Sequence, residues 1–304
     1  MKEKYLWAAL IVILISWAGN YTYFQSKQLD EPIFLKHYSD SYYIKDGESM
    51  LTFYYLTNKQ NPANVHYLRI DGHEFYPNNQ GMSFHYDQEF RHHYLKSVMI
   101  PFPEHSLPIS GDGTWTFESM EVGFDQYPPR TYDIGKVAFY PQQEAELPFD
   151  FRMSSGSSSH RSDTAFVATE KVTLEAIKIP FPEAADDLEV KLNLDQEKLK
   201  ELDALQDGRD IPEWYDQSLH EDWNKIDGVI ANDDFFPYSI EKDEWLRMMI
   251  YFNPERTSAF EFSLNLQGTT ENGERFNIMA PINDFPSLEQ KDVDELVDQQ
   301  GGAY

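Results

Sequence analysis

The chain has 304 residues, which suits two domains of ordinary size, and its formal charge at pH 7 is -27. So acidic a chain repels phosphate backbones, which excludes nucleic acid as an expected partner. The charge is typical of a well-hydrated soluble surface, or alternatively of a polyanion that attracts divalent cations or a basic partner. The absence of cysteine excludes disulfides, cysteine nucleophiles and lipid attachment through cysteine.

Residues 1–24 predict a membrane segment. The run Tyr5–Gly19 carries no charge, and its extension to Phe24 is long enough to cross the hydrocarbon of a bilayer as a helix. Lys2 and Lys4 precede the run, so the positive-inside rule places the N-terminus in the cytoplasm and the body outside it. We therefore expect a single-pass anchor that attaches an extracytoplasmic body to the cell membrane.

A cleaved signal peptide is the alternative to a retained anchor. Ser16, Trp17 and Ala18 fit the small-x-small pattern, so cleavage near Ala18 would release a secreted protein. Either interpretation places the body outside the cytoplasm. An exported chain without disulfides favours a bacterial source, and a Gram-positive one among bacteria.

Residues 25–142 predict a first β-sandwich domain. Residues 25–47 read as an extended polar stalk, and Asp71-Gly72 predicts a hairpin turn. Proline and glycine punctuate a series of short apolar runs, which is typical of antiparallel strands in a sandwich. The expected strands are 49–57, 65–70, 73–76, 94–100, 114–122 and 131–140.

Residues 143–286 predict a second β-sandwich domain, after a boundary near 141–147 where PQQEAEL interrupts the strands. Ser154–Ser159 reads as a flexible polar loop. Helical periodicity replaces strand periodicity near 195–226, which predicts a short helical insertion. The expected strands are 148–153, 164–170, 172–179, 188–194, 245–252, 258–267 and 275–281.

One short motif occurs twice. Ile100–Glu104 and Ile179–Glu183 both read IPFPE, 79 residues apart, and each follows an expected strand. The repetition indicates either two related modules or one turn geometry used twice. Proline cannot donate a ladder hydrogen bond, so we expect these runs to leave the sheet or to lie at an edge.

Residues 287–304 predict a C-terminal helix and tail. Ser287 with Gln290 three residues later fits a capping box. Leu288, Val293, Leu296 and Val297 would form its apolar stripe.

The sequence contains no G-x-S-x-G elbow, Walker A loop or Rossmann glycine pattern, so it names no catalytic and no cofactor-binding residue. His85, His92 and His93 lie close to Asp87 and Glu89, which could form a metal site, but a solvated loop is the preferred interpretation. Asp233 and Asp234 are the candidates for a calcium site built from separate loops. We assign no metal ligand from these patterns.

Four tryptophans, Trp115, Trp214, Trp223 and Trp245, are expected in the cores, with sugar stacking as the alternative. The fold class is mainly β: two tandem antiparallel sandwiches, with an immunoglobulin-like form as one version, behind one transmembrane helix. The layout is similar in general terms to anchored accessory proteins of Gram-positive bacteria, which assigns no activity.

Three functions are compatible with these features. The first is a non-catalytic binding or assembly protein with a protein or cell-wall partner, and we prefer it because catalytic motifs are missing. The second is a cell-wall carbohydrate hydrolase that uses paired carboxylates. The third is a calcium-stabilised adhesion or spacer module.

Overall fold

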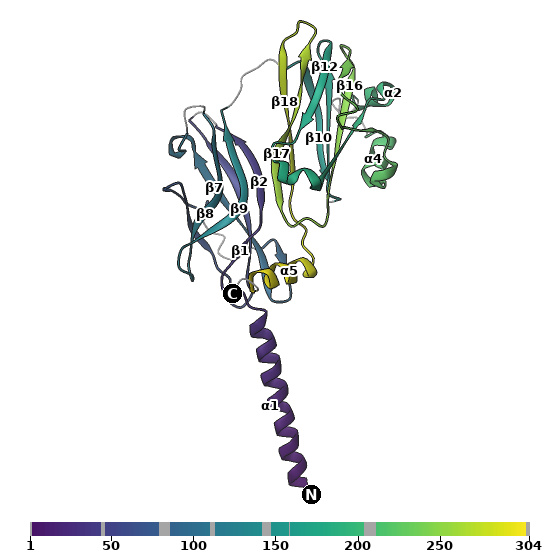
Figure 1. Ribbon diagram of the computed structural model, residues 1–304. Helices are drawn as coiled ribbons and strands as arrows, with labels where there is room; N and C mark the ends of the chain where they lie inside the picture. The colour runs from purple at the N-terminus through teal and green to yellow at the C-terminus, as the bar shows by residue number, and fades with distance from the viewer. Residues whose placement is uncertain are drawn as a thin grey trace.

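The computed structural model describes residues 2–43, 46–78, 86–109, 113–141, 147–157, 159–203 and 211–301 (Figure 1). It is mainly β, with several antiparallel sheets and one N-terminal helix, as predicted. The expected boundary at 142/143 lies outside the described residues, so the division into domains at that point stays a prediction. We call the strands of residues 33–140 the first β unit and those of 149–284 the second β unit.

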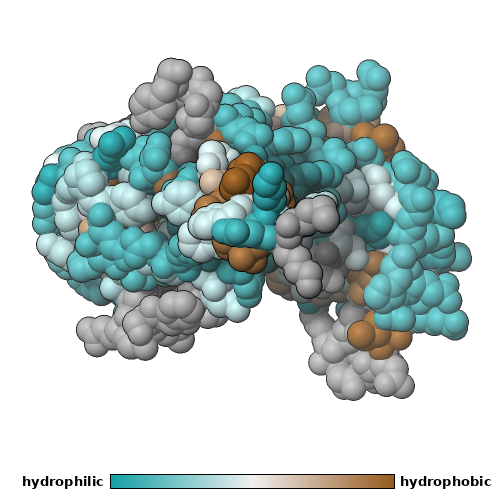
Figure 2. All heavy atoms as spheres, turned by 90° about the horizontal axis from the view of Figure 1, so that it is seen from below, coloured by the Kyte–Doolittle hydropathy of each residue, from teal (hydrophilic) through white to brown (hydrophobic). Residues whose placement is uncertain are grey.

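Helix α1, Lys2–Ser26, projects away from both β units (Figure 1). It is the one helix in the described part of the chain that is long and apolar enough to cross a membrane, and none of its span from Glu3 to Ser26 is buried. Seen from below, hydrophobic side chains gather near the centre, where α1 descends, within a mostly hydrophilic surface (Figure 2). An apolar helix exposed along its length requires a non-aqueous environment or a partner.

The first β unit encloses an aromatic core between two sheets. One sheet has the order β1-β3-β7-β6, and the other contributes β2-β9-β8-β4-β5. Phe53, Phe102 and Phe139 are fully buried between them. The elements are β1 Ile33–Phe34, β2 His37–Tyr42, β3 Glu48–Asn58, β4 Val65–Ile70, β5 His73–Phe75, β6 Gln88–Glu89, β7 His93–Pro103, η1 Glu104–Ser106, β8 Trp115–Phe124 and β9 Arg130–Tyr140.

The second β unit packs the sheet β10-β11-β16-β13-β14 against β15, β12, β17 and β18. The predicted flexible loop at Ser154–Ser159 is wrong in its first part, because Ser154 to Ser157 continue β10 and pair with β11. The elements are β10 Phe149–Ser157, β11 Arg161–Ala168, β12 Val172–Lys178, η2 Pro182–Asp187, β13 Leu188–Asn193, β14 Val229–Ile230, β15 Tyr238–Ile240, β16 Trp245–Phe252, β17 Ala259–Thr270 and β18 Arg275–Asp284.

The predicted helical insertion is present between β13 and β14. It comprises α2 Gln196–Leu199, η3 Lys200–Leu202, α4 Glu213–His220 and η4 Trp223–Lys225. Leu199, Leu202 and Tyr215 pack against Ala165 and Trp245 on the outer face of the β11–β16 sheet. The insertion therefore adds a third layer to the second unit (Figure 1).

Strand β2 joins the two units. It pairs in parallel with β9, from His37↔Gly135 onward, and in parallel with β17, from Ala259↔His37 to Glu261↔Ser39. The predicted stalk at 25–47 is therefore wrong: residues 33–34 and 37–42 form strands within the body. Gly135 has φ of +89°, and an added Cβ would lie 2.5 Å from the carbonyl oxygen of His37, so glycine permits this close pairing.

The C-terminal helix α5, Gln290–Gly301, returns to the first unit. Leu288, Val293 and Val297 pack there with a cluster that includes Leu56 and Leu95, and Leu296 packs against it partly buried, which confirms the predicted apolar stripe. The helix begins later than Ser287 predicts, because the Glu289 amide donates to Asp292 Oδ2 at 2.6 Å. Helix α5 thus lies near the end of α1 (Figure 1).

Each copy of the IPFPE motif inserts its phenylalanine into a core. Phe102 belongs to the first core and Phe181 to the second, and a 3-10 turn begins within the last two residues of each copy. Pro101 and Pro103 pair with β3, and no described strand pairs with them on the other side of β7; the second copy leaves its sheet after Lys178. These positions agree with the expected behaviour of proline, whereas duplication of a module stays a prediction.

Candidate functional site

The contact between the two units contains a gap in the β-ladder. One side of β17 pairs with β2 as far as Glu261 and with β12 from Asn265 onward. Asp40 fills this gap, because its carboxylate accepts the Ser263 amide at 3.1 Å and the Ser263 hydroxyl at 3.4 Å. A side chain thus satisfies a backbone donor for which no strand is available.

Burial perturbs the carboxylates on both sides of this contact. It raises the pKa of Asp40 to about 6, and the two bonds from Ser263 only partly oppose the rise. Burial also raises the pKa of Glu261, with the nearby charge of Asp40 as the second cause. Asp40 therefore changes its protonation state close to the physiological range.

A pocket of about 370 Å³ opens beside Asp40, on the side of the contact away from Asn283 and Asp284. We call it the distal pocket. It is lined by Asp40, Tyr42, Tyr140, Asn265, Gln267 and Asn277, among others. The Asn277 amide donates to Asn265 Oδ1 at 3.1 Å, while Asn277 Oδ1 is buried and has no hydrogen-bond partner among the described residues.

The lining of the distal pocket combines aromatic faces with amide groups. The rings of Tyr42 and Tyr140 are tilted, with centroids 6.4 Å apart. Amide side chains offer both donors and acceptors, and tyrosine rings offer apolar faces. This combination suits a polar, largely uncharged ligand, and a pocket between structural units is a common place for one.

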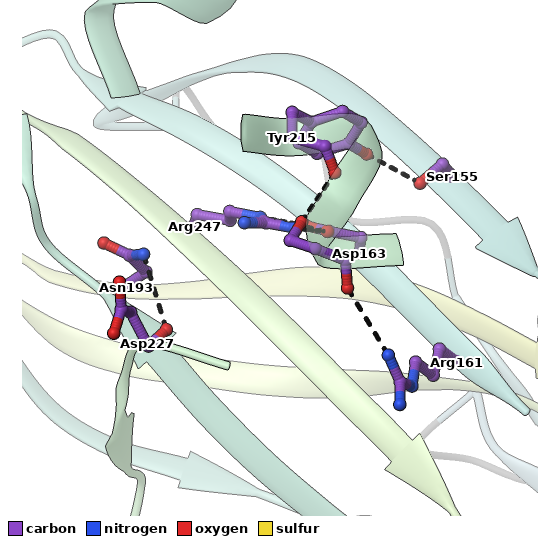
Figure 3. A network of polar contacts seen from close by, with 8 residues as sticks. Ser155, Arg161, Asp163, Asn193, Tyr215, Asp227 and Arg247 are labelled. Atoms are coloured by element: carbon purple, nitrogen blue, oxygen red, sulfur yellow. Dashed lines mark hydrogen bonds and ion pairs between the residues drawn. The ribbon is translucent and has the colours of Figure 1, made fainter. Parts of the chain in front are cut away.

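A second polar cluster lies beneath the helical insertion (Figure 3). Arg247 Nε donates to both Asp163 oxygens at 2.9 Å, and Arg247 Nη2 donates to Asp163 and to Ser218 Oγ. The hydroxyls of Tyr215 and Ser155 lie 2.9 Å apart. Burial raises the pKa of Asp163 despite Arg247, but the adjoining cavity of about 20 Å³ has room for little more than one water.

The predicted histidine cluster contacts the end of α1. His85 lies outside the described residues. His93 is 1% exposed, burial lowers its pKa, and the ring of His92 meets Phe24 edge-on at 5.6 Å. Within the residues that the structure describes, no three His, Asp or Glu side chains are grouped to hold a metal ion.

The remaining candidates separate into surface and core. Asp233 and Asp234 are exposed between β14 and β15, and calcium binding there stays untested. Trp115, Trp223 and Trp245 are buried, as the core interpretation predicts. Trp214 is half-buried beside Arg247.

Sequence reasoning missed the pocket residues Asp40 and Tyr42, because they fall in the predicted stalk. The usable signal was the alternation of Tyr38, Asp40 and Tyr42, which has the two-residue period of a strand. Asn265 and Asn277 lie in expected strands, but amides there gave no sign of a pocket.

Comparison with known proteins gives little. No protein-family model matches the chain, and no curated protein matches it. Among solved structures it is similar to the collagen-binding domain of Erysipelothrix rhusiopathiae surface protein RspB, at 7% identity over 83% of this chain and 92% of that chain. The TM-score is 0.22, so we draw nothing about this chain from that likeness.

Proposed function

We propose that the chain is a membrane-anchored, extracytoplasmic binding protein without catalytic activity, which engages its partner at the distal pocket. The exposed apolar helix α1 carries the proposal, since it gives the body a fixed attachment at one end. The distal pocket supports the binding role, because it presents amides and tyrosines between two units that β2 holds together.

Topology can be tested with introduced cysteines, because the chain has none of its own. Lys242→Cys lies in an exposed turn of the second unit, and Lys4→Cys lies at the start of α1. A membrane-impermeant maleimide applied to intact cells should label Lys242→Cys but not Lys4→Cys. The reverse pattern would overturn the proposal, and a mature chain that begins at Gly19 in the medium would replace the anchor with a signal peptide.

Binding can be tested by photocrosslinking in the membrane. A photoreactive amino acid at Gln267 should give a discrete adduct with a protein or cell-wall component. The same residue at Glu118, exposed on β8, serves as the control. Equal adducts at Gln267 and Glu118 would contradict binding at the distal pocket. So would the absence of an adduct when the photoreactive residue is placed at Gln267 and, in a second variant, at Asn265.

A second function, hydrolysis of cell-wall carbohydrate, is favoured by one observation. Asp40 lines an aromatic pocket and has a pKa raised to about 6, as a general acid requires. The neighbouring Glu261 is not among the described lining residues of that pocket. Release of wall fragments by the native chain and not by Asp40→Asn would establish hydrolysis and refute the non-catalytic proposal.

A further inference from the structure

The first β unit contains a buried lysine beside the side-chain amide of an asparagine. Lys96 of β7 is 7% exposed, and its Nζ donates to Asn64 Oδ1 at 2.5 Å and to the Ala63 carbonyl at 3.3 Å. The side-chain carbonyl carbon of Asn64 therefore lies no more than about 3.7 Å from Nζ, since one C=O bond separates it from Oδ1. That separation is close to the one from which an amine can attack the carbon.

A carboxylate holds the same side-chain amide through its nitrogen. Asp125 Oδ2 accepts from Asn64 Nδ2 at 2.9 Å, and Asp125 Oδ1 accepts the backbone amide of Asn64 at 3.0 Å. The backbone amide of Asp125 donates in turn to the Asn64 carbonyl at 3.1 Å. A lysine only donates and a carboxylate only accepts, so the two partners fix which end of the amide is oxygen and which is nitrogen. The nitrogen that a nucleophile would displace thus contacts a group that can carry a proton.

The protonation state of Lys96 favours nucleophilic attack. Burial lowers the pKa of Lys96, and the charges of Asp125 and Asp87 oppose this change only partly. A lowered pKa increases the fraction of neutral amine, which is the nucleophilic form. Asp125 itself is exposed, so a small molecule released beside it can leave directly into the solvent.

A second buried lysine provides a comparison within the same chain. Lys191 of β13 is also 7% exposed, and its Nζ donates to the carbonyls of Trp223 and Ile226 at 2.7 and 3.5 Å. Backbone carbonyls can satisfy a buried ammonium group, but they offer no side-chain amide nitrogen that could be displaced. Among the described residues, Lys96 is the buried lysine that donates to a side-chain amide.

We propose that Lys96 and Asn64 form an intramolecular isopeptide bond, with Asp125 as the catalytic residue that transfers the proton. The neutral Nζ attacks Cγ of Asn64, so a C–N bond forms and the carbonyl electron pair moves to Oδ1. Both nitrogens are then bonded to one carbon, and the Asp125 carboxylate takes a proton from Nζ and gives it to Nδ2. The C–Nδ2 bond breaks as the carbonyl re-forms, and one molecule of ammonia leaves.

The bond would join the two sheets of the first unit. Lys96 lies in β7 of one sheet, and Asn64 directly precedes β4 of the other. The two residues are 32 positions apart, so the cross-link closes a long loop and stabilises the unit by restricting the unfolded chain. The reaction occurs once in each chain, and it is independent of binding at the distal pocket.

Peptide mapping by mass spectrometry tests the bond in the full-length chain, purified in detergent, denatured and digested with trypsin. Residues 60–69 should be joined to residues 92–130, because trypsin does not cleave after an acylated lysine. The joined mass should be smaller than that of the two separate peptides by one ammonia. Cleavage after Lys191 should be complete, which provides the internal control. Complete cleavage after Lys96 with a free, intact peptide 60–69 would overturn the proposal.

Loss of ammonia from a separate peptide 60–69 would also overturn it, since that result indicates a cyclic imide at Asn64 rather than a cross-link. Lys96→Arg should give separate peptides and a lower melting temperature than the native chain. Lys59→Arg is the matched control, because it keeps a positive charge beside Glu89 and should leave the joined peptide in place.

Asp125→Asn tests the proton transfer, with circular dichroism to establish that the variant is folded. We expect separate peptides in the folded variant, because the amide has no carboxylate to carry the proton. A joined peptide that forms in Asp125→Asn as fast as in the native chain would refute the role of Asp125.

Discussion

The region beneath the helical insertion and the contact around β2 each bury a carboxylate, Asp163 and Asp40. In the described residues only Asp163 forms an ion pair. Asp163 is bound by Arg247, which also holds Ser218 of α4. Among the described residues, Asp40 is bound only by the amide and hydroxyl of Ser263. The paired carboxylate holds the helical insertion on the sheet. The carboxylate without an ion pair has a pKa raised to about 6, so it changes protonation state near neutral pH, and it lies beside a pocket.

The largest effect should follow from breaking the pair. Arg247→Met leaves Asp163 buried without a cation, and we expect a loss of about 4 kcal/mol in the free energy of unfolding. Denaturant titration followed by tryptophan fluorescence measures this loss. The double variant Asp163→Leu/Arg247→Met should recover most of it, and a double variant as unstable as the single one would show that packing dominates.

A somewhat smaller loss should follow at β2. Gly135→Ala should destabilise the chain by about 3 kcal/mol, since it combines an unfavourable positive φ with a clash against the backbone of His37. Gly72→Ala is the control, because Gly72 has φ of +84° and nothing within 4 Å of the added atom. Equal losses in thermal unfolding would mean that the close pairing of β2 with β9 contributes little.

Asp40→Asn should change the dependence of stability on pH. The folded pKa of about 6 lies above the usual 3.8, so the folded state holds the proton more tightly. The contribution of Asp40 to stability is complete below about pH 4 and is lost as the pH rises through about 6. Asparagine avoids the charged form, so the variant should gain about 2 kcal/mol over the native chain at pH 8 and nothing at pH 4.

Urea unfolding at the two pH values measures this gain. Asp133→Asn on β9 is the matched control with the opposite sign, because a hydrogen bond from Lys36 lowers the pKa of Asp133. That variant should gain nothing at pH 8. A native chain whose stability does not fall between pH 4 and pH 8 relative to Asp40→Asn would contradict the assignment of an unpaired buried carboxylate.

The smallest expected loss of stability is at the N-cap of α2, where the helical insertion begins. Asp195 Oδ1 accepts the amides of Glu197 and Lys198 at 3.2 Å, so it caps α2. Asp195→Ala should reduce the free energy of unfolding by about 1 kcal/mol, which is the usual contribution of a cap. Hydrogen exchange at the α2 amides should rise in this variant and not in the exposed control Asp233→Ala.

The sequence predicted those strands that are rich in apolar and aromatic residues and bounded by turn residues. Residues 65–70 and 245–252 were expected as strands and are β4 and β16. Strand β2 was missed because its HYSDSY sequence places polar side chains on both faces of the strand, and such a run resembles a solvated segment. Ser154 to Ser157 of β10 were missed for the same reason.

The candidate sites depend on long-range contacts that no local sequence pattern predicts. Asp163 and Arg247 are 84 residues apart, and Asp40 and Ser263 are 223 apart. Each of these residues alone reads as an ordinary surface group. Only the register of β2 against β17 brings Asp40 to the gap in the ladder, and that register follows from tertiary packing rather than from propensity.

The return of α5 to the first unit has a mechanical consequence. A pull on the second unit directed away from α1 would load two attachments besides the chain between β9 and β10: the β2–β17 ladder and the α5 contact. Parallel strands under tension along their length are loaded in shear, so their hydrogen bonds must break together rather than one at a time. Under the proposed function, the body would therefore transmit force between a bound partner and the bilayer without first separating its two units.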